Sequence, residues 1–191
     1  IATRSLAMVH AAIFDVVNAI EGTPGLYVAQ AAPADSSAIA AVAAAAERVL
    51  AYLYPAQQAS LEAALAVSLA RVTDGAAETN GVALGVPVAA AVIALRASDG
   101  WDDFVDYLGG DQPGQWRATE PMFALPLLPQ WATLDPFTMT SPSQFRPAGP
   151  PPLTSEAYAA ALDDVKALGR QTGGTRTAEQ TAIARFWADG P

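Results

Sequence analysis

The sequence predicts an all-α fold, a helical bundle of about six helices with a long ordered loop rich in proline and aromatic residues. Helical periodicity, caps and breakers mark out six segments, whereas residues 99–153 carry proline and glycine at every few positions. Hydrophobic residues make up 52% and charged residues 15% of the 191-residue chain. That composition supports a compact core, so we expect residues 1–191 to form a single helical unit.

The first predicted helix spans residues 2–20 and is apolar on nearly every side. Leu6, Val9 and Ile13 begin one apolar face, and Phe14 and Val17 belong to a second. A helix that is apolar all round belongs in the middle of a structure. We therefore expect this helix to be central and buried.

Three further helices are predicted over residues 36–53, 55–72 and 76–97, the first of them capped by Asp35 or Ser36. The last of the three carries small residues at four-residue spacing, which let a neighbouring backbone come close: Ala77, Gly81, Gly85 and Ala89. Its apolar stretch, residues 81–95, is shorter than the roughly 20 residues that cross a bilayer. We therefore predict a core helix and no membrane span.

Residues 99–153 have no sustained period, because prolines and glycines interrupt them throughout. Aromatic residues punctuate the same segment too often for a flexible linker. We expect an irregular but ordered wrap that presses on the helical core. Two helices are predicted after it, over residues 155–169 and 177–187, and Thr177 and Gln180 match a capping box at the start of the second.

Charge and composition exclude several kinds of function. The chain has 10 Lys and Arg against 19 Asp and Glu, a net charge of -9, so we predict no nucleic-acid partner. No cysteine and a single histidine exclude the common zinc sites. One acidic run lacks the spacing of a calcium loop, and we interpret it as a solvated turn anchored by aromatic residues: Asp99, Asp102, Asp103, Asp106 and Asp111.

The polar residues of the first helix are interpreted as buried and structural. His10, the only imidazole, lies one turn before Phe14, with Asp15 and Asn18 close by in sequence. A lone histidine on an apolar helix is usually a satisfied core residue, and a catalytic histidine is the alternative. No G-x-S-x-G or G-x-G-x-x-G motif accompanies it. The residues therefore predict a helical domain without a reactive centre of its own.

Five strings, spread over the chain in matching order, resemble the vanadium-dependent haloperoxidases of the type 2 phosphatidic acid phosphatase superfamily. They are RSLAMVHAAIFDVVNAI at residues 4–20, RASDG at 96–100, PGQWRAT at 113–119, PPPL at 150–153 and RTAEQTAIARFW at 176–187. The family often has Arg-Pro where this chain has Arg117-Ala118.

The resemblance implies a helical bundle in which one lysine, two arginines and histidines hold vanadate or phosphate. This sequence does not contain that set: Lys166 is followed too soon by Arg170, and Arg146-Pro147 has Thr140 where the family has lysine. A Ser-Gly-His string is also absent, and in the family these motifs follow the stretch that corresponds to Trp187. The resemblance thus implies the N-terminal helical half only, with no catalytic, cofactor-binding or metal residue in this chain and with vanadate bound by the full-length parent.

The wrap residues are candidates for the rim of a substrate entrance in that parent, and core packing of a long loop is the alternative. These candidates are Trp116, Arg117, Trp131, Phe137 and Phe145. The chain also lacks an initiator methionine, and we expect a fragment that misses sequence at both ends.

The expected function is that of a scaffold half, inactive alone, of a protein that oxidises halide with hydrogen peroxide. Its partners are then the missing C-terminal helical half and, for the parent, halide, peroxide and a small organic substrate. A phosphate-ester hydrolase of the same superfamily and a non-catalytic helical interaction module are the alternatives. Because the first helix is apolar on all faces, we expect the isolated chain to associate with itself, including as a homo-oligomer.

Overall fold

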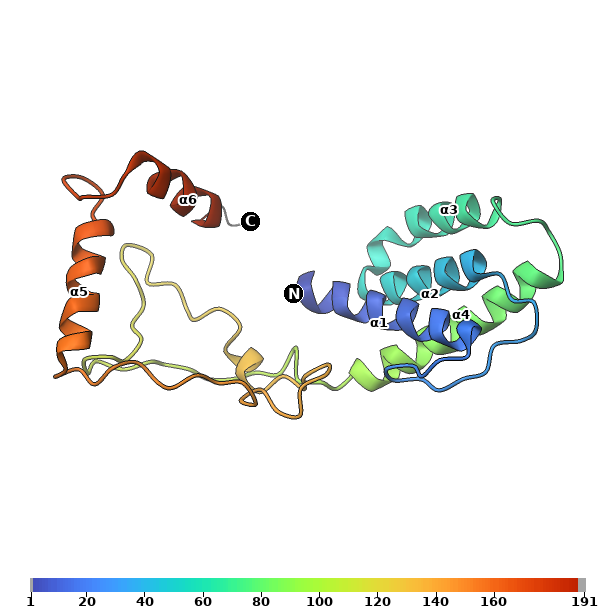
Figure 1. Ribbon diagram of the computed structural model, residues 1–191, viewed down its shortest axis with the longest axis horizontal. Coiled ribbons are helices and arrows are strands. Elements are labelled where there is room, and N and C mark those ends of the chain that lie inside the picture. The colour runs from blue at the N-terminus through green and yellow to red at the C-terminus, as the bar shows by residue number, and fades with distance from the viewer. Residues whose placement is uncertain (1, 189–191) are drawn as a thin grey trace. The chain divides into compact units, whose positions relative to one another are not determined.

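The computed structural model describes residues 2–188, and its regular elements over that range are all helical (Figure 1). The predicted all-α fold is confirmed. Residues 1 and 189–191, where we expect the chain to be cut, lie outside the described residues. The elements are α1 (Ala2–Glu21), α2 (Ala38–Leu53), α3 (Gln58–Leu69), α4 (Ala76–Arg96), α5 (Glu156–Leu168) and α6 (Ala178–Ala188), with 3₁₀ turns η1 (Pro55–Gln57) and η2 (Pro129–Ala132).

Helix starts follow the predicted capping chemistry with one correction. Thr177 and Gln180 exchange hydrogen bonds between side chain and backbone N–H, at 2.9 and 3.1 Å, so the capping box is confirmed. Ser155 caps α5 by accepting from the Tyr158 N–H. The prediction of Asp35 or Ser36 as the cap of α2 is wrong, because Ser37 accepts from the Ala40 N–H.

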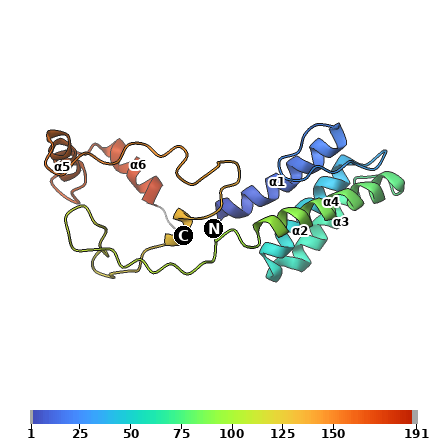
Figure 2. The ribbon, with the colours of Figure 1, turned by 90° about the horizontal axis from the view of Figure 1, so that it is seen from below.

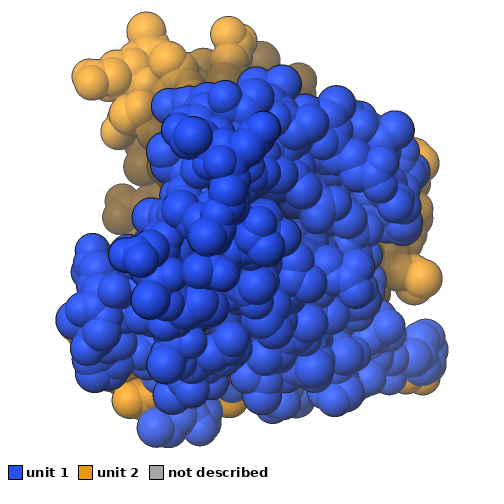
Figure 3. Space-filling model, turned by 90° about the vertical axis from the view of Figure 1, so that its right-hand side faces the viewer, with its two compact units in different colours: residues 1–104, 130–141 blue, residues 105–129, 142–191 orange. Residues whose placement is uncertain are grey.

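The chain divides into two compact units, where we expected one (Figure 3). Unit 1 comprises residues 1–104 and 130–141, and unit 2 comprises residues 105–129 and 142–191. All buried residues within 2–188 belong to unit 1. The described part of unit 2 has no fully buried residue and therefore no hydrophobic core like that of unit 1.

The core of unit 1 lies where α1, α2 and α4 pack together (Figure 1). Two glycines of the predicted small-residue row bring α4 against the α2 backbone. A Cβ atom at Gly85 would lie 2.2 Å from the Ala41 carbonyl oxygen, and one at Gly81 would lie 2.5 Å from that of Ser37. The predicted close approach is therefore confirmed.

α4 is long and apolar enough to cross a membrane by length and composition alone. In this structure one face of it packs on α1 and α2, through Leu84, Val88 and Val92. That packing agrees with the interpretation of α4 as a core helix.

α1 is buried on one side only, whereas we expected burial all round. Met8, Ala12 and Val16 are fully buried in the core. On the other side Leu6 is 59% and Phe14 51% exposed. Figure 2 shows the cause, since α1 lies at the edge of the helical group and its neighbours α2 and α4 lie on one side.

The irregular segment contacts the helical core over its first residues, 99–104, and again over residues 130–141. Within the second stretch, which we call the strap, Trp131 and Phe137 are half-buried, and the Phe137 ring lies 6.4 Å from that of Tyr27. Gln130 donates to the Trp101 carbonyl at 2.8 Å. The chain therefore leaves unit 1 after Phe104 and returns to it at Gln130.

Replacing Gly85 with alanine tests the close packing of α2 and α4. Alanine favours a helix over glycine by about 1 kcal/mol, so without the contact this substitution would stabilise the protein. Because the added methyl meets the Ala41 carbonyl, we expect a loss of about 1–3 kcal/mol in urea unfolding. Gly149→Ala is the control, since no atom lies within 4 Å of its new Cβ. A Gly85→Ala protein more stable than the parent would contradict the packing.

Candidate functional site

Buried polar side chains mark the places where unit 1 departs from a plain hydrophobic core. Charged groups are rarely buried unless they are paired or strongly hydrogen-bonded. The buried polar residues are Arg4, Ser5, Asp15, Arg96 and Asp99. Three of them form one cluster, and Asp15 forms a second site on α1.

The first cluster joins the start of α1 to the end of α4 through Asp99. Arg4 donates from Nε to Asp99 Oδ2 at 2.9 Å and from Nη2 to Oδ1 at 3.1 Å. Arg96 donates from Nε to the same Oδ2 at 2.9 Å, and its Nη2 lies 2.7 Å away. One carboxylate thus neutralises part of two buried guanidinium charges.

The same cluster holds the strap. Arg96 donates to the carbonyl oxygens of Asp135 and Pro136, and its guanidinium lies 4.0 Å from the centre of the Phe137 ring. The Asp135 N–H donates to the Asp99 carbonyl at 2.9 Å. Charge, cation–π contact and backbone hydrogen bonds therefore fix residues 135–137 against α4.

Tyr27 adds a further bond to the strap by donating from its hydroxyl to the Phe137 carbonyl at 2.5 Å. Burial raises the pKa of the Tyr27 hydroxyl above its usual value, the positive charge of Arg96 lowers it, and the negative charge of Asp15 raises it. The net direction is upward, so the phenol stays protonated and remains a donor.

The arginine pair does not fit vanadate or phosphate. Two adjacent guanidinium groups are what a tetrahedral oxyanion requires. Here Asp99 and backbone carbonyls occupy the donors of Arg4 and Arg96, and both side chains are almost fully buried. Lys166 lies in unit 2, exposed and 3.6 Å from Asp163. Within residues 2–188, no three Asp, Glu, His or Cys side chains gather as a metal site.

Asp15 fastens the segment after α1 to the helix. Its buried carboxylate accepts from the backbone N–H groups of Leu26, Tyr27 and Val28, the last two at 3.0 and 2.9 Å. A Cβ atom at Gly25 would lie 2.9 Å from Asp15 Oδ1. Asp15 is buried, its carboxylate bonds to the segment after α1, and a glycine is needed beside it.

His10 and Asn18 differ from the prediction of buried polar residues. His10 is exposed, because it lies on the side of α1 opposite the core. Asn18 is half-buried, and its amide donates to the Phe14 carbonyl at 2.8 Å while its oxygen accepts from the Thr23 hydroxyl. Asn18 therefore links the end of α1 to Thr23, and His10 does not belong to the core.

The five rim candidates are divided between the two units. Trp131 and Phe137 belong to the strap in unit 1, and the Trp131 Nε1 is buried without a hydrogen-bond partner in the described structure. Trp116, Arg117 and Phe145 belong to unit 2 and are exposed. Trp116 packs on Tyr107 with ring centres 5.9 Å apart. A shared rim stays a prediction.

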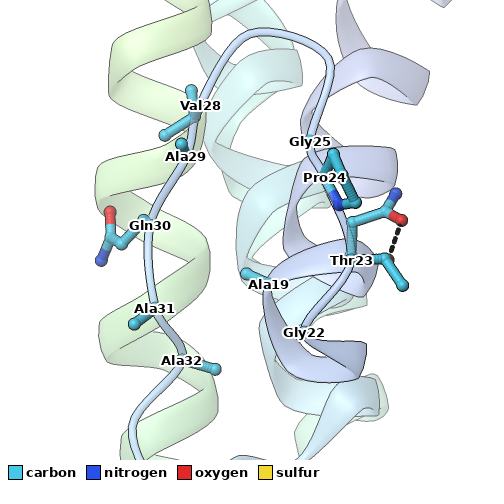
Figure 4. Close-up of a pocket in the computed structure, with 11 residues that line it drawn as sticks. Ala19, Gly22, Thr23, Pro24, Gly25, Val28, Ala29, Gln30, Ala31 and Ala32 are labelled. Atoms are coloured by element: carbon cyan, nitrogen blue, oxygen red, sulfur yellow. Dashed lines mark hydrogen bonds between the residues drawn. The ribbon is translucent and has the colours of Figure 1, made fainter.

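A cavity of about 400 Å³ lies between the end of α1 and the segment that follows it (Figure 4). Its polar side chains are those of Asn18, Thr23 and Gln30, and the rest of its wall is backbone, alanine, valine, glycine and proline. Asn18 and Thr23 are bonded to each other, and Figure 4 shows Gln30 pointing away from Thr23. The lining residues include no ionisable side chain, so this cavity offers no acid–base chemistry.

Comparisons with protein-family models, with curated proteins and with solved structures find no match for this chain. The function proposed below therefore rests on the sequence strings and on the geometry of unit 1. No sequence pattern predicted the Arg4–Asp99–Arg96 cluster, and the interpretation of Asp99 as solvated is wrong because its carboxylate is buried between two arginines. The sequence did offer one indication of this cluster. Arg4 stands at the start of one apolar helix and Arg96 at the end of another, and Asp99 follows three residues after Arg96.

Asp99→Asn tests the cluster. The neutral amide leaves two buried guanidinium groups without their counter-charge, so we expect a loss of about 3–5 kcal/mol in urea unfolding. We also expect a red shift of tryptophan fluorescence as the strap loosens around Trp101 and Trp131. Asp102→Asn, an exposed change in the same acidic run, should alter stability by less than about 0.5 kcal/mol. Equal stability of the two variants would refute the role of Asp99.

Asp15→Asn tests the second site. The amide can accept through one oxygen only and places an NH₂ group against backbone donors, so we expect a loss of about 2–3 kcal/mol. Amide exchange at residues 26–28 should accelerate more than exchange in α4. Asp35→Asn replaces an exposed carboxylate at φ 58°, a conformation that asparagine tolerates, and should cause no loss.

Proposed function

We propose that this chain is the N-terminal helical scaffold of a vanadium-dependent haloperoxidase-like protein, whose oxyanion site lies in polypeptide outside these residues. The full-length parent oxidises halide with hydrogen peroxide in this proposal. The 191-residue chain supplies packing surfaces and has no turnover of its own.

The observation that carries the proposal is the position of the polar residues in the strings that resemble the family. Arg4, Asp15, Arg96 and Asp99 all belong to those strings, and all are buried. Each bonds one element of unit 1 to another. Such residues suit a scaffold, because they bond to other parts of the same chain.

The exposed apolar side chains support a scaffold that needs neighbours. Leu6 and Phe14 are exposed on α1, and Phe186 and Trp187 on α6 are 73% and 80% exposed. Large exposed apolar side chains in such number mark surfaces that other protein covers. The same observation favours the second candidate function, a non-catalytic helical module that binds a partner.

An assay of the complete polypeptide from its source separates these functions. The intact mass is measured first, followed by bromide oxidation and phosphate-ester hydrolysis after loading with vanadate or without it. We expect a mass well above 19.7 kDa, vanadate-dependent bromide oxidation by the complete polypeptide, and no turnover by residues 1–191 alone.

Each other outcome rejects part of the proposal. Hydrolysis without bromide oxidation would assign a phosphatase of the same superfamily. A complete polypeptide of 19.7 kDa would reject the scaffold and leave the interaction module. Turnover by the 191-residue chain with added vanadate would contradict the assignment of the oxyanion site to other polypeptide.

A further inference from the structure

The strap, residues 130–141, is a separable part of unit 1. The buried apolar residues of unit 1 all belong to α1, α2 and α4, and no strap residue is buried to the same degree. The chain that leads into the strap and away from it, residues 105–128 and 142–155, lies outside the helices. The hydrophobic core of unit 1 is therefore built without the strap, which lies against it as an added segment.

The helical group holds the strap backbone at three successive residues, 135–137. Arg96 donates to the first two carbonyl oxygens of this stretch, and Tyr27 donates to the third. The first N–H of the stretch donates to the Asp99 carbonyl at 2.9 Å. Every residue carries a carbonyl, so these bonds are open to any sequence whose backbone follows the same course. They provide affinity without selecting side chains.

Two residues of this stretch determine which sequence fits. The centre of the Phe137 ring lies 4.0 Å from the Arg96 guanidinium and 6.4 Å from the centre of the Tyr27 ring, so this position selects an aromatic residue. Pro136 has no N–H, and its bond to Arg96 uses the carbonyl alone. Asp135 is exposed and bonds to the helical group through its backbone. The selected sequence is therefore x-Pro-aromatic.

The charge of the Arg4–Asp99–Arg96 cluster strengthens these contacts. The cluster contains two guanidinium groups and one carboxylate, so a net positive charge remains beside the strap. A charged donor forms a stronger hydrogen bond to a carbonyl oxygen than a neutral donor does. The face of an aromatic ring is also negative and attracts the same guanidinium. Backbone carbonyls followed by an aromatic ring are thus the ligand chemistry that this part of unit 1 attracts.

We propose that Tyr27, Arg96 and the Asp99 carbonyl form a peptide-binding site for x-Pro-aromatic segments, with the strap as its resident ligand. The covalent link keeps the strap at a high local concentration, so a segment of another polypeptide binds once the strap has been released. The strap thereby blocks its own site. This inference rests on contacts within unit 1 and is independent of the proposed function, since neither activity assay bears on it.

Cutting the 191-residue chain on both sides of the strap tests whether the strap is held as a ligand. Recognition sequences for a site-specific protease are inserted after Ala124 and after Ala148, where the chain is exposed. After cutting, non-covalent contacts alone hold residues 125–148. We expect this fragment to co-elute with residues 1–124 in size-exclusion chromatography at about 50 μM. Release of the fragment, or loss of amide-exchange protection in α4 after cutting, would overturn the proposal.

Synthetic peptides of residues 130–141 then measure what the site recognises, and their variants cannot fail by misfolding of the protein. We expect the parent peptide to displace the fragment from the cut protein and to bind the uncut chain at least about a hundredfold more weakly, because the strap competes there. Phe137→Ala in the peptide should weaken binding about tenfold or more. Thr138→Ala, the matched control at an exposed neighbour, should change it by less than about twofold.

Three results would overturn the proposal. The first is no displacement of the fragment by the parent peptide. The second is equal binding of the Phe137→Ala and Thr138→Ala peptides, since the site would then not select an aromatic residue. The third is equal binding of the parent peptide to the cut and uncut chains, which would show that the strap does not occupy the peptide's site.

Discussion

The Asp99 carboxylate is the group on which the arrangement of unit 1 depends most. Two buried arginines reach it from the first turn of α1 and from the last turn of α4, and each arginine also bonds to backbone carbonyls. Without this carboxylate, two positive charges would remain in a site from which water is excluded. The three side chains therefore act as a unit, which holds the first turn of α1, the end of α4 and the strap against one another.

The cluster also explains why the two neighbouring arginines, Arg4 and Arg96, do not form an anion-binding site. Arg4 and Arg96 are paired guanidinium groups of the kind that binds phosphate, yet a carboxylate of the same chain already holds them. In unit 1 the buried polar residues hold the helices together, whereas several large apolar side chains, among them Leu6 and Phe14, are exposed. This division of roles underlies the scaffold function that we propose.

The sequence predicted most of the fold and only part of the site. The helices, the capping box at Thr177 and the glycine row of α4 are local patterns, which is why periodicity and residue type identified them. The bond between Arg4 and Asp99 joins residues 95 positions apart, and no local pattern encodes such a partner. The acidic run that contains Asp99 predicted solvated side chains. Four of its five members are exposed, and Asp99 alone among them is buried. His10 shows the same limit, because an apolar helix does not reveal which of its sides will meet the core.

Residues 105–129 form a loop that leaves unit 1 and returns to it at the strap. Phe104 and Gln130 lie at the two ends of residues 105–129, and Trp101 and Gln130 are hydrogen-bonded next to them. The intervening segment is thus an excursion whose two ends are anchored to the same body, and the entropy of closing such a loop changes slowly with its length. We therefore expect the helical group to accept insertions into, or exchange of, residues 105–129 at little cost to its own fold.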